Sequence, residues 1–351
     1  MPAPDLSIIV PVLDEAVALP RLLHQLAQQR GIILEIIVVD GGSTDNSPGL
    51  ARAHGARVLH SEAGRGQQMN VGAQAARAPW LLFLHADTLP CGATQLRDAV
   101  NKLSEHPGHV VGGHFALEFE RSAERNGLLY RYMQEKTATH RPYTINGDQG
   151  LLIASRTFHA LGGFDTRLAF LEDQRFAATL QQRGEWLLLP GHLVTSARRF
   201  EVEGAKTRYI LMAVIMAMYV IDLEEFFTRA PRVYQAQSAT ERLLLTPYFR
   251  CLRAIMADIC WRESWLYWVR VGHFVVAESW QLFFFWDVVL RPWLGPGRYP
   301  ATRFHDAIFA PLVQHRVGAW LTAILVFTYT MGVLAPWYRW RERSQLHKNK
   351  D

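Results

Sequence analysis

His85 and Asp87 are the first residues of this chain whose types and spacing suggest chemistry. They end the stretch WLLFLHADT (80–88), where an apolar run typical of a buried strand is followed by an imidazole and a carboxylate. A carboxylate at a strand end can bind Mg²⁺ or Mn²⁺, whereas an imidazole suits Mn²⁺ better than Mg²⁺. We therefore predict that Asp87 and His85 bind a divalent metal, Mn²⁺ or Mg²⁺. The alternative is a strand end with a satisfied polar cap.

A glycine-rich basic segment, AGRGQQMNVGAQAA (63–76), opens a predicted helix. An arginine offers a bidentate donor to phosphate, and the N-terminus of a helix adds backbone N–H groups and a favourable dipole. We predict that Arg65 contacts a phosphorylated donor substrate, and that Gln68 and Asn70 also contact it.

Three further polar residues lie where a ligand could be reached. INGDQGLLI (145–153) places Asp148 and Gln149 between glycines, which allow close approach to a ligand but also mark ordinary turns. In TSARRF (195–200), Arg199 is a candidate diphosphate contact, with a solvated charged strand as the alternative. We include Asp148, Gln149 and Arg199 among the candidate ligand-binding residues.

Glu172 and Asp173 open another predicted helix, at 171–184. Acidic residues are expected in the first turn of a helix because they interact favourably with its dipole. Their position alone therefore does not indicate catalysis.

Alternating strands and helices must position these residues. Short apolar runs at 6–15, 32–40, 56–60 and 80–85 predict strands, and amphipathic segments between them predict helices. This rhythm indicates an α/β fold, with a mostly parallel sheet flanked by helices. In open sheets of this kind ligands bind beyond the carboxyl ends of the strands, so Asp40, His85 and Asp87 should face one crevice.

Three motifs, VVDGGSTDNS (38–47), FLHADT (83–88) and FLEDQRFAATLQQRGEW (170–186), resemble family 2 glycosyltransferases in order and spacing. The resemblance covers about residues 5–230 and implies the Rossmann-like GT-A fold. Within that family, GRGQQMNVGAQAA (64–76) and GDQGLLI (147–153) are similar to the branch that contains arsenosugar-biosynthesis and 4,4'-diaponeurosporenoate glycosyltransferase-like proteins.

The resemblance implies an inverting transfer of a sugar from a nucleotide-diphosphate donor to an acceptor hydroxyl. Asp173 then matches the general base, and Asp87 matches the metal-binding D-x-D motif, whose first acid is replaced here by His85. Asp40 matches the position that reads the base or ribose. The family usually has a second acid after it, where this chain has Gly41, so a UDP-sugar is only the default donor. The resemblance also places the loop with Asp148 and Gln149 near the acceptor side or the donor sugar, so both are predicted donor-binding residues.

Composition narrows the choice of partners and compartment. A formal net charge of +5 and a pI near 9.2 suit polyanionic ligands or an anionic membrane surface. No RNA-binding signature accompanies the charge, so we do not expect nucleic acid as a partner. The cysteines, at 91, 251 and 260, form no CxxC motif, which favours a reducing compartment. The first residues lack the pattern of a signal peptide, so we expect this region in the cytoplasm.

The C-terminal part has a different character. We predict a catalytic domain at 1–230 and a helical, aromatic-rich, membrane-associated region at 231–351, joined by a polar linker at 229–241. Residues 317–338 carry no charge and are flanked by arginines, as in a membrane span. A second apolar stretch, 264–290, is interrupted by charges and could lie in the membrane interface. A soluble helical domain is the alternative.

These features predict an enzyme at the cytoplasmic face of the cell membrane, with an acceptor that could be a membrane-borne lipid. Two other functions stay open: a non-catalytic membrane-associated scaffold that retains the fold, and a nucleotidyltransferase. The latter usually has a glycine-rich basic loop where this chain has VPVLDE (10–15). A Rossmann oxidoreductase is disfavoured because no G-x-G-x-x-G follows the first strand.

Overall fold

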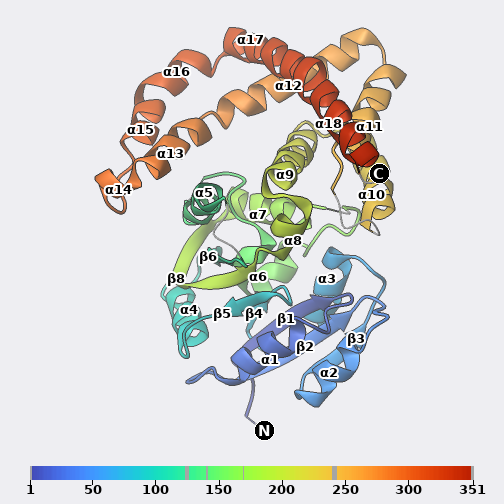
Figure 1. Cartoon of the computed structure of the whole chain (residues 1–351). Helices are drawn as coiled ribbons and strands as arrows, with labels where there is room; N and C mark the ends of the chain where they lie inside the picture. The colour runs from blue at the N-terminus through green and yellow to red at the C-terminus, as the bar shows by residue number, and fades with distance from the viewer. Residues whose placement is uncertain (1, 123–125, 140, 169, 239–242, 349–351) are drawn as a thin grey trace. The chain divides into compact units, whose positions relative to one another are not determined.

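The computed structural model describes residues 2–122, 126–139, 141–168, 170–238 and 243–348 (Figure 1). The chain divides into two compact units, Met1–Ala197 and Arg198–Asp351. The division falls earlier than the boundary at 230 suggested by the sequence. The long helix 205–220 accounts for the difference, because its Leu211 and Met218 are buried in the hydrophobic core of the second unit.

The first unit is built on one eight-stranded sheet in the order β3-β2-β1-β4-β7-β6-β8-β5. The strands are β1 (Leu6–Val12), β2 (Leu34–Asp40), β3 (Arg57–His60), β4 (Trp80–Phe83), β5 (Thr88–Pro90), β6 (Val111–Glu120), β7 (Leu151–Ala154) and β8 (Glu185–Ser196). Four neighbouring strands, β1 to β4, are parallel, and β6 runs parallel to β8. Only β7 and β5 run against their neighbours, which confirms the predicted mostly parallel sheet.

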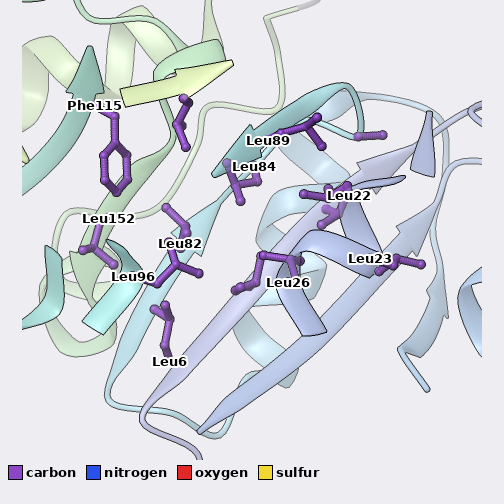
Figure 2. Close-up of a cluster of buried hydrophobic side chains, with 14 of the residues drawn as sticks. Leu6, Leu22, Leu23, Leu26, Leu82, Leu84, Leu89, Leu96, Phe115 and Leu152 are labelled. Carbon is purple, nitrogen blue, oxygen red and sulfur yellow. The ribbon is translucent and has the colours of Figure 1, made fainter. Parts of the chain in front are cut away.

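Helices cover both faces of this sheet. They are α1 (Leu19–Ala27), α2 (Ser47–Ala53), α3 (Arg65–Ala75), α4 (Gln95–Ser104), α5 (Gly127–Thr137), η1 (Gly147–Gln149), α6 (Ser155–Ala160) and α7 (Glu172–Arg183). Side chains of a strand alternate between its faces. Ile8 accordingly packs in a core with Leu22 and Leu26 of α1, whereas its neighbour Ile9 packs in another core with Met69 of α3. Figure 2 shows part of the first core.

Gly72 brings α3 close to the sheet. A Cβ atom added there would lie 2.4 Å from Cγ2 of Ile9, a separation that real Cβ atoms do not show. Only glycine lets the helix backbone approach β1 so closely. This approach places the N-terminus of α3, and with it Arg65, at the carboxyl edge of the parallel strands.

The reversed direction of β7 brings a distant loop to the same edge. Phe83, the last residue of β4, pairs with Leu151, the first residue of β7. The turn that follows β4 and the η1 segment that precedes β7 therefore lie beside each other. Four of the predicted site residues, His85, Asp87, Asp148 and Gln149, occur in these two connections.

The second unit is helical throughout its described residues. Its elements are α8 (Arg198–Glu203), α9 (Ala205–Val220), α10 (Glu224–Ser238), α11 (Thr246–Asp258), α12 (Trp261–Ala277), α13 (Trp280–Val289), α14 (Arg291–Leu294), α15 (Pro300–Phe304), η2 (His305–Phe309), α16 (Ala310–Val313), α17 (Arg316–Phe327), η3 (Thr328–Leu334) and α18 (Ala335–Lys348). The linker predicted at 229–241 is wrong for residues 229–238, which belong to α10. Ala230 is fully buried there and packs with Phe226 in the core of this unit. Residues 239–241 lie outside the described residues.

One helix among the described residues is long and apolar enough to cross a membrane by length and composition. It runs from Arg316 to Ser344, has a mean hydropathy of 1.8 over its most apolar window, and that window is only 11% buried. The other predicted apolar stretch, 264–290, is divided between α12 and α13 at Glu278 and Ser279.

Candidate active site

His85 and Asp148 meet at the carboxyl edge of the sheet, where β4 ends and β7 begins. Nδ1 of His85 lies 2.6 Å from Oδ1 of Asp148, and the side chain of His85 is only 14% exposed. Burial favours the neutral ring, but the hydrogen bond and the charge of Asp148 outweigh it and raise the pKa of His85 above its ordinary value. The sequence predicted both residues for the site but not their pairing.

Arg65 forms an ion pair with Glu172 across the same edge. Nε of Arg65 lies 3.2 Å from Oε1 of Glu172, whose side chain is 3% exposed, whereas 43% of the arginine side chain is exposed. Desolvation by surrounding protein atoms lowers the pKa of Arg65, but carboxylates outweigh it and raise the pKa above its usual value. The carboxylates are those of Glu172, Asp173, Asp148 and Asp87. These side chains therefore form one electrostatic cluster.

Asp173 lies in this cluster at the N-terminus of α7. Its Oδ2 accepts a hydrogen bond of 2.6 Å from the backbone N–H of Gly147, and its Oδ1 accepts one of 2.7 Å from that of Gln174. A Cβ atom added at Gly147 would lie 3.0 Å from Nε2 of His85 and 3.2 Å from Oδ2 of Asp173. Glycine at this position thus lets the imidazole and the carboxylate approach the same backbone segment.

Asp40 is the last residue of β2, and its side chain holds the turn that follows. Its side chain accepts hydrogen bonds from the backbone N–H groups of Gly42 and Ser43, and Nδ1 of His60 lies 3.3 Å from its Oδ2. Burial raises the pKa of Asp40, but the hydrogen bonds from Ser43 and Gly42 outweigh it and lower the pKa. These hydrogen bonds form an Asp-Gly turn. A contact between Asp40 and a nucleotide stays a prediction.

Three of the predicted donor-binding residues instead have their side chains bonded within the protein. Gln68 donates to the backbone oxygens of Val12 and Val39, which joins the ends of β1 and β2. Asn70 exchanges two hydrogen bonds with the backbone of Phe164. These contacts hold α3 and the loop before α7 in place. Both residues thus stabilise the backbone that carries the cluster.

Gln149, the third of them, is fully buried and differs in this from its neighbour Asp148. Its Oε1 lies 2.7 Å from Nδ1 of His114, and its Nε2 donates to the backbone oxygen of Thr144. These bonds fix the loop, and a contact between Gln149 and a donor stays a prediction. Arg199 belongs to α8 in the second unit, and its contact with a diphosphate stays a prediction.

Glu172 was seen in the sequence only as a helix-opening acid. Arg65 and Glu172 are too far apart in the sequence for any local pattern to connect them, so their ion pair could not be predicted from the sequence. The only available signal was the pair of adjacent acids, Glu172 and Asp173, at the start of one helix.

A divalent cation fits this site only if the substrate supplies part of its coordination. Among the described residues, no three histidine, cysteine or acidic side chains form a ready-made metal site. Mg²⁺ in particular is commonly held by one or two carboxylates together with the phosphates of a substrate. Asp87 can be such a ligand. It lies half-buried in the turn after β4, and its charge contributes to the raised pKa of His85.

A cavity of about 200 Å³ lies along α7, from Gln174 to Gln182. One wall is the loop 141–145, which includes Tyr143, and the other is a helix face that carries Gln174 and Gln181. Nε2 of Gln174 also donates to the backbone oxygen of Ile145. The cavity therefore begins at the residue next to Asp173.

We predict that Glu172→Gln weakens donor binding and leaves the fold intact. Glutamine keeps the size of the side chain but removes the charge that holds Arg65, so the guanidinium loses its orientation toward a phosphate. We expect the KM for the donor to rise by about 10-fold, as is typical when a positioning partner is lost, with a much smaller change in kcat. A 10-fold fall in kcat with an unchanged KM for the donor would contradict this role. Glu172→Asp keeps the charge and should restore part of the affinity for the donor.

The sequence matches the family described as glycosyl transferase family 2 over residues 7–159. A PGL/p-HBAD biosynthesis glycosyltransferase of Mycobacterium bovis is 34% identical over an alignment of 155 residues that covers 37% of this chain and 60% of the relative. An uncharacterized glycosyltransferase of Haemophilus influenzae is 28% identical over an alignment of 184 residues that covers 50% of this chain and 62% of the relative. The chain thus spans about 60% of the length of these relatives.

Among solved structures, S. aureus TarS 1–349 in complex with UDP is 17% identical, with a TM-score of 0.48 and coverage of 93% of this chain and 92% of that one. The mannosyltransferase PcManGT from Pyrobaculum calidifontis, in complex with GDP-Man and Mn²⁺, is 17% identical with a TM-score of 0.45 and covers 93% and 87%. Similarity at this level does not determine what this chain binds. The sequence match, by contrast, covers the four parallel strands, the turn with His85 and Asp87, and Asp148. Residues 7–159, which lie in the first structural unit, thus form a glycosyl transferase family 2 domain.

Proposed function

We propose that the protein transfers a sugar from a nucleotide-diphosphate donor to an acceptor hydroxyl and inverts the anomeric configuration. The observation that carries the proposal is that Asp173 and His85, from segments far apart in the sequence, approach the same backbone segment at Gly147, while Glu172, the neighbour of Asp173, pairs with Arg65. Such a transfer needs a cation for the diphosphate and a base for the acceptor. Arg65 is suited to the diphosphate and Asp173 to the proton of the hydroxyl.

In this proposal Asp87 and His85 hold a divalent cation, Mn²⁺ or Mg²⁺. When bound, the cation stabilises the negative charge that the diphosphate gains as it leaves. Asp148 orients the imidazole of His85 through Nδ1 and so leaves Nε2 for the cation, an arrangement common among metal-bound histidines. Manganese suits the imidazole better than magnesium does.

Asp173 acts as the general base of a single displacement. Its Oδ2 is held by the backbone of Gly147, so the carboxylate has a defined direction before the acceptor arrives. The carboxylate takes the proton of the acceptor hydroxyl while its oxygen attacks the anomeric carbon. A single attack without a covalent enzyme intermediate inverts that carbon. We assign the acceptor to the cavity that begins at Gln174, the residue next to the base.

We further propose a UDP-sugar as the default donor and the cytoplasmic face of the cell membrane as the location. The helix Arg316–Ser344 supports the location, because most of its apolar surface is not covered by protein. A lipid acceptor would agree with this placement.

Binding of nucleotide sugars tests the proposal directly. We expect one nucleotide sugar to raise the thermal unfolding temperature of the full-length protein, and to raise it more with Mn²⁺ than with a chelator, because a ligand that binds only the folded state stabilises it. The nucleoside that carries the same base should give little stabilisation, since it lacks the diphosphate. If no nucleotide sugar stabilises the protein with or without metal, the scaffold function is favoured instead. Release of pyrophosphate from a nucleoside triphosphate and a sugar phosphate would indicate a nucleotidyltransferase.

A further inference from the structure

A helical hairpin occupies residues 280–313 in the second unit (Figure 1). Its first arm is α13 and its second arm is formed by α15, η2 and α16, with the turn between them at 295–299. Gly295 and Gly297 in this turn have φ angles of +74° and +73°, which other residues rarely adopt. The ring of Tyr299 stacks on Phe284 at 5.5 Å. The hairpin is therefore a defined structure and not an open loop.

Polar groups hold the two arms together from the inside. Asp287 is fully buried and accepts hydrogen bonds from the backbone N–H groups of Ala301 and Thr302 and from the hydroxyl of Thr302. His305 is also buried, and its Nε2 lies 2.8 Å from the hydroxyl of Ser279. Because these groups are satisfied within the hairpin, their polarity does not prevent transfer of the hairpin into an apolar medium.

The outer face of the first arm is apolar. Leu282 and Trp286 lie one turn apart on α13, and Leu290 and Trp293 follow at the end of α13 and in α14. They are between 40% and 78% exposed. The second arm repeats the pattern with three exposed residues, Phe304, Ile308 and Leu312. Large apolar residues thus predominate on the outside of a hairpin whose interior contains a carboxylate and an imidazole, and its exposed charged residues are Arg298, Arg303 and Asp306.

The helix that precedes the hairpin has a different surface. The exposed residues of α12 include Glu263, Arg270 and His273, which are suited to water, as well as Trp261 and Leu266. In α13, by contrast, the exposed residues are Leu282 and Trp286, so the surface becomes uniformly apolar where the hairpin begins.

The hairpin is too short to cross a lipid bilayer. The ten residues of α13 rise about 15 Å at 1.5 Å per residue, half of the roughly 30 Å of a hydrocarbon core. After this distance the chain turns back. Basic residues suited to anionic headgroups, Arg298 and Arg303, are exposed in the turn and in the second arm. The hairpin then continues into the helix Arg316–Ser344, whose surface is also apolar.

From these observations we infer that residues 280–313 insert into one leaflet of a bilayer that contains anionic lipids, without crossing it. The exposed tryptophans at 286 and 293 are of the type enriched where headgroups meet acyl chains. This inference does not rest on sugar transfer. It would hold for a protein with no catalytic activity and would fail even if the transferase activity were established.

Site-directed fluorescence can measure the position of the hairpin in the full-length protein. The native cysteines are first replaced (Cys91→Ser, Cys251→Ala and Cys260→Ser), and an environment-sensitive NBD label is attached to Trp293→Cys. The matched control carries the label at His273→Cys, an exposed position on α12. The protein is mixed with vesicles of phosphatidylcholine with and without phosphatidylglycerol, and brominated lipid serves as the quencher within the bilayer.

With phosphatidylglycerol present, the label at 293 should shift to shorter wavelength, be quenched by brominated lipid and be protected from aqueous iodide. The label at 273 should stay accessible to iodide. Equal iodide quenching of both labels on vesicles would overturn the inference. A label at 293 that is already protected before vesicles are added would also overturn it, because a second copy or another part of the chain would then cover the hairpin. Asp173→Asn should insert like the wild type, which separates this result from catalysis.

Discussion

Asp173→Asn is expected to reduce sugar transfer by about 10²- to 10⁴-fold, the usual contribution of a general base, while donor binding persists. The carboxylate is held by backbone N–H groups of Gly147 and Gln174 and lies in the electrostatic cluster around Arg65. An amide has the same shape but cannot accept the proton of the hydroxyl. The attacking oxygen would then have to lose its proton to water.

The measurement compares the initial rate of transfer with the affinity for the donor, determined separately by thermal shift or calorimetry. Asp98→Asn is the matched control, because it makes the same chemical change on α4, where Asp98 bonds to Arg97 and Thr94. The amide at position 173 has one oxygen for two backbone donors, so a loss of roughly 1 kcal/mol in stability is expected. Near-normal turnover in the Asp173→Asn enzyme would remove Asp173 from the role of base.

Asp87→Ala should abolish the effect of Mn²⁺ on donor binding. It should also lower the transfer rate by a factor comparable to that expected for Asp173→Asn. A metal that stabilises a developing charge contributes several kcal/mol, and each 1.36 kcal/mol corresponds to about a tenfold change in rate. We therefore expect a loss of about 10²-fold or more. Alanine removes the only carboxylate in the turn that follows β4, whereas His85 remains bonded to Asp148.

A manganese titration of donor binding distinguishes a metal ligand from a structural residue. In the wild type, the affinity for the nucleotide sugar should rise with Mn²⁺, and in the Asp87→Ala enzyme it should not respond. His85→Gln should give an intermediate response, since it removes one of two proposed ligands. An Asp87→Ala protein that retains the full manganese response would exclude this carboxylate from the metal site, although the rest of the proposed function could stand.

Much of the first unit could be predicted because its determinants are local. Apolar β-branched runs such as IILEIIVVD (32–40) form buried strands, and the segments between them form helices. Parallel strands place their carboxyl ends at one edge of a sheet, so residues that follow β2 and β4 were expected there. The predicted membership in a glycosyltransferase family needed only the order and spacing of short motifs.

The domain boundary and the linker were less predictable. Residues 229–238 are polar on average, which suggested a linker, yet Ala230 packs in a helical core. The average polarity of a segment does not reveal that one face is covered. The hairpin at 280–313 shows the same limitation, because the charges that seemed to interrupt an apolar stretch include Asp287, which is buried and hydrogen-bonded.

The amino-acid sequence by itself determined the strand and helix pattern, the family, and the residue types that gather at the edge of the sheet. These depend on neighbours within a few positions along the chain. Only the tertiary structure decided which polar groups pair: Asp148 with His85, Glu172 with Arg65, and Gln149 with His114. A hydrogen bond or an ion pair forms only when two side chains meet within about 3 Å at a suitable angle. For residues far apart in the chain, that meeting depends on how every strand and helix between them packs.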